Sequence, residues 1–459
     1  MAERLGADVD LDAVPLKYPG LEPWEVWLSE AQERMVVAVA PRCVDELRER
    51  SARHRVGMSD IGEFTGTGRL VVRSGGRPVL DLAMDFLHDG RPTRTMTAVA
   101  AVPSTDVTGR RVDDAAATLL ALLAHPNISS KASIIRRYDH EIGGATLVRP
   151  LVGDGGCGHA DGVVLARPGD EHGLAIGIGV NPWYGLHDPR SMAMVAVDEA
   201  MRNVVAVGAD PDLAALLDNF SWGDPRQPAV LGEMVAAVDG CCEAALAFDA
   251  PFVSGKDSLN NTYAGTDGAR HSVPPTLVIT AVAHVPDADR CVTPELTAPG
   301  RVLLLLGITD RHFAGSHLDL LEGAHRRCSP AAGMAPQFDP GAPRRYRNLH
   351  RAIRAGLVTS CHDLSEGGLA VALAEMCIAS GLGASIDSLP HDDVTAALFS
   401  ESAGRLIIEV ADRDVEAVSE MVGAVHRLGT VVAEPTLNIA GVAAIGIDRL
   451  HRAFTGTPW

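Results

Sequence analysis

Near its end the sequence reads Leu398-Phe399-Ser400-Glu401-Ser402-Ala403-Gly404-Arg405, and this stretch runs into the apolar residues Leu406 to Val410. A similar pattern stands near the start, where Trp27-Leu28-Ser29-Glu30-Ala31-Gln32-Glu33-Arg34 runs into the apolar residues Met35 to Ala40. The same pattern at two distant places is typical of a duplicated structural unit. This duplication is the feature of the sequence that decides the predicted fold.

The residues after each copy extend the repeat. An acid-rich helical stretch follows in both cases, at Val44 to His54 and at Val415 to Leu428. Short β-type runs come next, around Ile61 to Phe64 and Thr430 to Ala433. The pattern therefore predicts a repeated strand–helix–strand unit of α+β type.

A long segment of α/β character separates the two copies, from about Thr95 to Pro286, and nothing before the first copy corresponds to it. We therefore predict a central α/β domain at residues 95-290, flanked by two related α+β domains at residues 1-94 and 291-459. On this interpretation the chain opens inside the first of two tandem units, and the central domain of that first unit is missing.

Composition and charge exclude several classes of protein. The chain has 459 residues, 46% hydrophobic and 22% charged, which suits two or three ordinary globular domains. Its formal net charge is -19. Binding to DNA, RNA or an anionic membrane needs a basic face, so none of these is an expected partner.

The cysteines and the first residues indicate the compartment. Eight cysteines are scattered along the chain with no C-x-x-C pair, which favours a reducing cytoplasm. The opening residues carry acids and lack the apolar core of a secretory signal, and no apolar run approaches the roughly 20 residues that span a bilayer. We expect a cytoplasmic protein.

A helix is predicted from Pro189 to Gly208, because Asp188-Pro189 is a favourable start and Gly208 a favourable stop. Its register places Glu199 and Asn203 four residues apart on one largely apolar face. Two oxygen donors that point to the interior would suit Mg²⁺. A solvated glutamate beside a capping asparagine would also fit these residues.

A glycine-rich turn, Gly153-Asp154-Gly155-Gly156-Cys157-Gly158-His159-Ala160-Asp161, ends in a carboxylate just before the β-type run Gly162 to Ala166. Glycines allow backbone amides to approach a phosphate closely. The turn neither follows a clear strand nor opens a helix, which argues against a dinucleotide-binding fingerprint. A plain surface loop is the alternative.

The stretch Ser254-Gly255-Lys256-Asp257-Ser258 follows an apolar strand and is rich in small polar residues. Ligands often bind where strands of α/β proteins end. It resembles the tail of a phosphate-binding P-loop, but the earlier glycine that such a loop requires is absent. A turn that merely ends the strand is the other interpretation.

The stretch Cys361-His362-Asp363-Leu364-Ser365-Glu366-Gly367-Gly368 precedes an amphipathic helix at Leu369 to Ser380. Asp363 and Ser365 could cap that helix, which is the ordinary role of such residues. They could equally offer a carboxylate to a metal and a hydroxyl to a phosphate. A Ser-His-Asp triad is not favoured, because no G-x-S-x-G elbow is present.

Taken together, these stretches resemble the phosphoribosylformylglycinamidine synthase family, in the superfamily of aminoimidazole ribonucleotide synthetase. The resemblance covers nearly the whole chain and rests on Leu28 to Met35, Tyr138 to Glu141, Asp198 to Asn203, Ser254 to Ser258 and His362 to Gly368. Members of the family have two tandem halves, each with a central α/β domain and an α+β domain. The resemblance thus implies that the second half is complete here.

The resemblance also implies a function and a site. It implies an ATP-dependent C–N ligase of purine biosynthesis, which converts formylglycinamide ribonucleotide and glutamine-derived ammonia to formylglycinamidine ribonucleotide. The implied cofactors are ATP or ADP and Mg²⁺. The implied contacts are Ala160, Gly255 and Ser365 for the nucleotide, Asp161, Glu199, Asn203 and Asp363 for the metal, and Glu30, Gln32 and Ser258 for the substrate.

Departures from the family matter equally. The family's catalytic histidine lies in the first central domain, which this chain lacks, so no catalytic residue is assigned and neither His140 nor His362 receives that role. Lys256 stands where shorter family members often have asparagine. The implied partners are an N-terminal synthetase half and a glutaminase subunit or domain. The rival hypotheses are a nucleotide-binding scaffold without activity of its own and another ATP-using enzyme of the superfamily.

Overall fold

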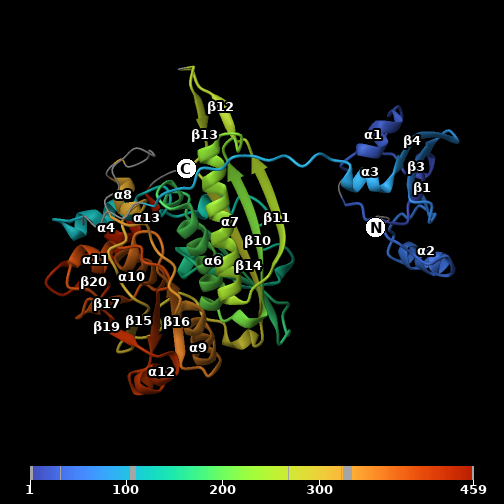
Figure 1. Ribbon diagram of the computed structural model, residues 1–459. Helices are drawn as coiled ribbons and strands as arrows, with labels where there is room; N and C mark the ends of the chain where they lie inside the picture. The colour runs from blue at the N-terminus through green and yellow to red at the C-terminus, as the bar shows by residue number, and fades with distance from the viewer. Residues whose placement is uncertain are drawn as a thin grey trace. The chain divides into compact units, whose positions relative to one another are not determined.

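A computed structural model describes residues 4–31, 33–103, 110–266, 268–321, 323 and 333–456. The chain divides into two compact units, Met1–Thr95 and Met96–Trp459. Figure 1 shows the elements of both units, and each unit is described by itself. In the described part of the chain, no helix combines the length and the apolar character that crossing a membrane requires.

The first unit is a small four-stranded sheet with short helices. The strand order is β2-β1-β3-β4, with β1 parallel to β3 and antiparallel to β2. The predicted helix after the first copy is confirmed as α2, and the predicted β-type run as β2. The elements of this unit are β1 (Ala7–Asp10), α1 (Pro23–Leu28), α2 (Val44–Arg53), β2 (Gly62–Phe64), β3 (Arg69–Ser74), β4 (Arg77–Ala83) and α3 (Met84–Asp89).

The apolar run Met35 to Ala40 is not a strand, so that part of the predicted repeat is wrong. The corresponding run of the second copy forms β18 (Leu406–Val410), which is paired on both sides by β15 and β16. No strand of the described residues pairs with 35–40, and Met35 is 89% exposed. Apolar side chains alone do not make a strand, because the backbone needs ladder partners.

The second unit begins with a six-stranded sheet in the order β11-β10-β14-β9-β8-β5. Two long helices, α6 (Pro189–Ala206) and α7 (Pro228–Phe248), cover one face of it, as Figure 1 shows. Its strands are β5 (Thr146–Val148), β8 (Gly162–Leu165), β9 (Gly173–Val180), β10 (Ala214–Trp222), β11 (Phe252–Leu259) and β14 (Thr276–Val285).

Helix α6 confirms the prediction made from its end signals. Asp188 caps its N-terminus by accepting a hydrogen bond from the Ser191 backbone at 3.0 Å. Gly208, with φ +104°, lies just beyond its C-terminus. The helix packs closely on β9, because a Cβ atom at Gly179 would collide with the Ala196 carbonyl. Nearly every side chain of α6 is therefore buried.

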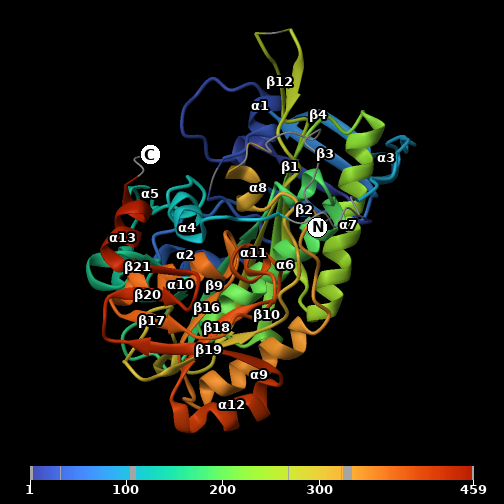
Figure 2. The same cartoon turned by 90° about the vertical axis from the view of Figure 1, so that its left-hand side faces the viewer.

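A seven-stranded sheet follows, in the order β16-β18-β15-β19-β17-β20-β21. Strand β15, the third of the seven, is continuously apolar and fully buried, because helices cover both faces of the sheet. Helices α9 and α12 pack on one face, and α10, α11, α13 and α4 on the other (Figure 2). The strands are β15 (Val302–Leu306), β16 (Val358–Asp363), β17 (Gly383–Ile386), β18, β19 (Val425–Val432), β20 (Thr436–Ile439) and β21 (Ala443–Gly446).

One helix of this region is shorter than predicted. The helix predicted from Val415 to Leu428 ends at Val422, because Gly423 turns the chain at φ +92° into β19. The α/β and α+β fold class is confirmed. The helices are α4 (Ala115–Leu123), α5 (Ala132–Ile135), α8 (His317–Leu321), α9 (Ala342–Arg354), α10 (Gly368–Ser380), α11 (Val394–Phe399), α12 (Val415–Val422) and α13 (Ile447–Thr455).

Candidate functional site

A polar pocket lies in the second unit, where several segments distant in the sequence meet. Helix α6 contributes Glu199 and Asn203, and the segment before β8 contributes Ala160 and Asp161. Further lining residues come from the segment between α4 and α5, from the end of β16 with the loop after it, and from α10. The polar lining includes Asn127, Lys131, Asp161, Glu199, Asn203, His362, Asp363, Ser365, Glu366 and Glu375.

The loop between β16 and α10 brings Asp363 and Ser365 to the pocket. Asp363 is the last residue of β16, and Gly367 and Gly368 follow with φ +79° and +67°. A side chain at Gly368 would collide with the Ser400 carbonyl, so only glycine fits this position. The repeated pattern therefore packs directly against the loop that carries the site.

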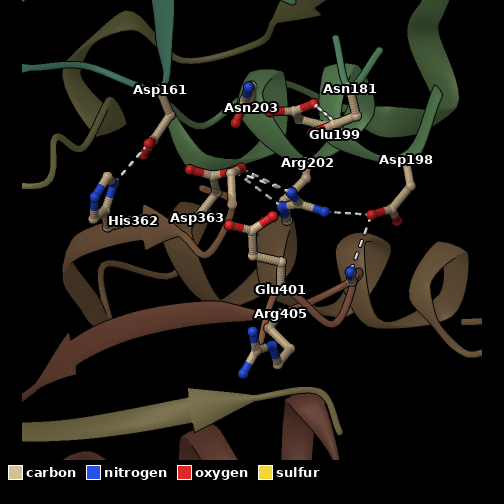
Figure 3. Close-up of polar contacts among 12 residues, drawn as sticks. Asp161, Asn181, Asp198, Glu199, Arg202, Asn203, His362, Asp363, Glu401 and Arg405 are labelled. Atoms are coloured by element: carbon tan, nitrogen blue, oxygen red, sulfur yellow. Dashed lines mark hydrogen bonds and ion pairs between the residues drawn. The ribbon is translucent and has the colours of Figure 1, made fainter. Parts of the chain in front are cut away.

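Asp363 is held by a buried arginine of α6. The Nε and Nη2 atoms of Arg202 donate to Asp363 Oδ2 at 3.2 and 3.1 Å, and Nη2 donates to Ser365 Oγ at 3.2 Å. Arg202 also forms an ion pair with Asp198, which accepts from the Tyr346 hydroxyl at 2.6 Å. Figure 3 shows Arg202 lying between the two aspartates. One guanidinium thus links the sheet–helix layer to the loop of the pocket.

Asp161 is held by His362 on the other side of the pocket. His362 Nδ1 lies 2.7 Å from Asp161 Oδ1, and Nε2 lies 3.1 Å from Glu375 Oε2. His362 and Asp161 are both almost fully buried in this contact. Figure 3 shows the His362 ring turned toward the Asp161 carboxylate. Only one oxygen of Asp161 is engaged in this way.

Glu199 and Asn203 face the interior, as the helical register predicted. Glu199 Oε2 accepts from the Val180 backbone at 3.0 Å and from Asn181 Nδ2 at 2.6 Å. Asn203 Nδ2 donates to the Ile178 carbonyl at 2.8 Å. Because this bond orients the amide, the side-chain oxygen of Asn203 is the atom available as a metal ligand.

Two buried oxygens of the pocket have no hydrogen-bond partner in the described part of the chain. They are Asp161 Oδ2 and Asn203 Oδ1. A buried acceptor without a partner costs about 1–3 kcal/mol, so each such atom calls for a partner, which a bound ion or an ordered water can provide. Oxygen donors from carboxylates and an amide are the ligands that Mg²⁺ prefers. Asp161, Glu199, Asn203 and Asp363 therefore fit a hard divalent cation.

The charges in the pocket also favour a cation. Burial raises the pKa of Asp161 to about 6 and that of Glu366 to about 7. The pKa of Glu199 is raised well above its usual value by burial and then by the nearby charges of Glu366 and Asp363. Burial acts in the same sense on Asp363, but Arg202 and His362 bring its pKa below the usual value. A divalent cation would relieve this repulsion between carboxylates.

Cation binding is expected to weaken in acid. Asp161, with a pKa of about 6, is ionised at pH 8 and mostly protonated at pH 5, and a proton competes with the cation for its oxygens. We expect the affinity for Mn²⁺, used as an analogue of Mg²⁺, to fall about tenfold from pH 8 to pH 5. Calorimetric titration without nucleotide measures this, because it excludes protonation of the nucleotide. Equal affinities at both pH values, with the fold intact by circular dichroism, would contradict the assignment.

Six of the ten predicted site residues lie together. The pocket is lined by Ala160, Asp161, Glu199, Asn203, Asp363 and Ser365. Gly255 and Ser258 lie instead on the edge strand β11 and are not among its lining residues. Glu30 belongs to the first unit, and Gln32 lies outside the described residues. The ligand roles of all ten residues remain predictions.

Several residues that line the pocket or bond to its lining were not predicted. Arg202 lies one helical turn from Glu199, on the face of α6 that the helical register predicts to be buried. A buried arginine needs an acidic partner, so its position could have indicated a role beside the pocket. Glu375 is an acid within the apolar helix α10, which is also a signal. Lys131 gave none. Its ammonium donates to the Pro126 and Ser129 carbonyls at 2.8 and 2.5 Å, and burial lowers its pKa to about 8.

Comparisons with known proteins show which domain families the chain matches. The family model described as AIR synthase related protein, N-terminal domain, matches residues 158–285. The model described as AIR synthase related protein, C-terminal domain, matches residues 1–75 and again 298–441. One model thus matches both ends of the chain, which confirms that the two flanking domains are related.

Among curated proteins, phosphoribosylformylglycinamidine synthase subunit PurL of Rhodopseudomonas palustris strain HaA2 is 35% identical over 458 residues, which are 98% of this chain and 59% of that protein. The subunit of the same name from Thermomicrobium roseum is 36% identical over 433 residues, 90% of this chain and 56% of that protein. The chain therefore spans about three fifths of the length of these relatives.

Solved structures show the same fold. PurL of Thermotoga maritima in complex with ADP superposes with a TM-score of 0.61 at 20% identity, over 94% of this chain and 60% of that one. The PurLQS structure of the same organism gives a TM-score of 0.59 at 22% identity, over 94% and 60%.

Proposed function

This chain belongs to the AIR synthase related protein family, and from that premise we propose that it is the C-terminal part of an ATP-dependent phosphoribosylformylglycinamidine synthase of purine biosynthesis. Its curated relatives carry that name. The reaction would consume formylglycinamide ribonucleotide, ATP and glutamine-derived ammonia. In it, ATP phosphorylates the amide oxygen of the substrate, and ammonia then displaces the phosphate.

The proposed nucleotide site is the pocket between α6 and the β16–α10 loop. Asp161, Glu199, Asn203 and Asp363 would hold Mg²⁺, which offsets charge on the phosphates when bound. Ala160 and Ser365 would contact the nucleotide. The observation that carries this proposal is the pair of buried, unpartnered oxygens, Asp161 Oδ2 and Asn203 Oδ1, which line the same pocket. Gly255 was predicted as a further nucleotide contact, and its place on β11 gives that role no support.

The six-stranded sheet of the second unit supports the proposal that the chain needs a partner. Helices α6 and α7 cover one of its faces, and the other face exposes apolar side chains at Leu165, Leu174 and Ile178, which are 39, 43 and 50% exposed. Ser258 pairs in register with Ser221 and lies on the same side of the sheet as these residues. We propose that an N-terminal synthetase half covers this face and that Ser258 contacts the substrate there. Glu30 and Gln32, of the first unit, remain proposed substrate contacts. A glutaminase subunit would supply the ammonia.

One observation favours a second candidate, in which the nucleotide is structural and the chain is a scaffold. Glu401, the counterpart of Glu30 in the second copy, is completely enclosed by protein groups. It accepts from the Tyr184 hydroxyl at 2.5 Å, from the Gly367 backbone at 2.7 Å and from the His317 backbone at 2.8 Å. A carboxylate so occupied has no oxygen left for a substrate beside this pocket.

An activity assay tests the main proposal. We expect the purified 459-residue chain, given formylglycinamide ribonucleotide, ATP, Mg²⁺ and ammonium salts, to release no phosphate above background, because on this proposal the catalytic histidine belongs to the N-terminal synthetase half. Adding the N-terminal half of a relative should produce formylglycinamidine ribonucleotide. Phosphate release and product mass are the two measurements. Turnover by the chain alone would contradict the dependence on a partner, and failure to bind Mg²⁺ and ADP would contradict the site.

A further inference from the structure

His362 has both ring nitrogens committed to carboxylates. Nδ1 lies 2.7 Å from Asp161 Oδ1, and Nε2 lies 3.1 Å from Glu375 Oε2. A carboxylate oxygen accepts hydrogen bonds, so each nitrogen donates and neither has a lone pair left for a metal ion. His362, Asp161 and Asp363 could otherwise be taken for a zinc-type cluster, since their ligand atoms all lie within 4.8 Å of one another.

The contact with His362 fixes which oxygen of Asp161 faces the pocket. Oδ1 is taken by the ring, and Oδ2 is buried without a partner. Asp363 is arranged in a similar way, because its hydrogen bonds from Arg202 and Ser365 all fall on Oδ2. In each of the two carboxylates, neighbouring side chains therefore hydrogen-bond to one oxygen. Such outer contacts orient metal ligands and tune their affinity.

We propose that His362 and Glu375 form a positioning pair, in which His362 holds Asp161 by one oxygen and presents the other to a hard divalent cation. Glu375, on α10, holds the ring in that orientation through Nε2. His362 is thus a positioning residue and not a metal ligand. The inference rests on the proposed Mg²⁺–nucleotide site and adds to it a residue that determines its affinity and its preference for oxygen-binding cations.

Two conservative variants separate this role from a purely structural one. In His362→Asn the amide nitrogen can occupy the place of Nδ1, so the bond to Asp161 is retained. In His362→Gln the amide nitrogen reaches instead toward the place of Nε2, so the bond to Glu375 is retained and that to Asp161 is lost. A role in packing alone would favour glutamine, because its volume is closer to that of histidine.

The experiment is a titration of the full chain with Mn²⁺, with and without saturating ADP, followed by electron paramagnetic resonance. We expect His362→Gln to lower Mn²⁺ affinity 10- to 100-fold and His362→Asn to lower it about threefold or less. Glu375→Gln should lie between them. His426→Asn serves as the matched control, because the His426 side chain lies outside the pocket lining and its ring hydrogen-bonds to the exposed Ser388 hydroxyl at 3.1 Å.

The outcomes are distinct. Equal losses in the asparagine and glutamine variants, or no loss in either, would overturn the positioning role while the wild-type chain still binds Mn²⁺. Coupling of Mn²⁺ to a directly coordinated imidazole nitrogen in electron spin echo spectra would also overturn it. A wild-type chain that binds neither Mn²⁺ nor ADP would refute the proposed function itself. Should a His362 variant fail to fold, Glu375→Gln gives the same test through the partner residue.

Discussion

Mg²⁺-dependent binding of ADP is expected to be lost when Asp363 is replaced by asparagine. The change removes a carboxylate from the proposed cation site but keeps an oxygen that can accept from Arg202 and Ser365. Arg202 would then keep Asp198 as its ion-pair partner but lose the carboxylate that lies between its positive charge and the cation. We expect ADP affinity in the presence of Mg²⁺ to fall by about 100-fold or more, which is about 2.7 kcal/mol.

Isothermal titration with ADP, in Mg²⁺ and in a chelator, measures this loss. The chelator arm matters, because the affinity that remains without Mg²⁺ should be the same in the wild-type chain and the variant. Asp412→Asn is the matched control, since Asp412 is 71% exposed and pairs with Arg427 at the surface. If the Asp363→Asn chain bound ADP in Mg²⁺ with wild-type affinity, Asp363 would not be part of the cation site.

Much of the fold was accessible from local patterns. The end signals of α6 are chemical properties of Asp188, Pro189 and Gly208, and they act within one turn of the helix. The apolar run Leu406 to Val410 was correctly predicted as a strand, whereas the matching run Met35 to Ala40 was not a strand. The two runs have similar side chains, and only the first has ladder partners. A strand depends on residues elsewhere in the chain, which periodicity does not show.

For the candidate site too, local patterns predicted some residues, whereas contacts between distant segments were not predicted. The register of α6 placed Glu199 and Asn203 on one buried face, and the structure brings them to one pocket with Asp161 and Asp363. Arg202 was within that same helix, yet its role became visible only when Asp363, 161 residues away, was seen beside it. His362 belongs to a motif that the sequence shows, but its two ring nitrogens contact Asp161 and Glu375, which lie on other elements. Contacts of this kind cannot be derived from spacing.

Arg202 itself is expected to be essential to the folded state. Its side chain is 2% exposed and pairs with Asp198 and Asp363, which are themselves 0 and 10% exposed. Replacing Arg202 by methionine keeps similar bulk but leaves two buried carboxylates without their cation. Breaking a buried ion pair in this way typically costs about 3–5 kcal/mol, because the remaining charge is uncompensated. In a chain of this size we expect the melting temperature to fall on the order of 5–10 °C.

The same variant should respond to ligand more strongly than the wild-type chain. A divalent cation at Asp363 would supply the positive charge that Arg202 no longer provides, whereas Asp198 would stay unpaired. We therefore expect Mg²⁺ and ADP to restore part of the lost melting temperature, measured by differential scanning fluorimetry with a chelator control.

Adding Asp198→Asn to Arg202→Met should restore a further part, because that change removes the second unpaired charge. Arg202→Lys should be intermediate, since an ammonium keeps the charge but cannot reach Asp198, Asp363 and Ser365 together. A melting temperature for Arg202→Met equal to that of the wild-type chain would show that this buried network does not hold the loop of the pocket in place.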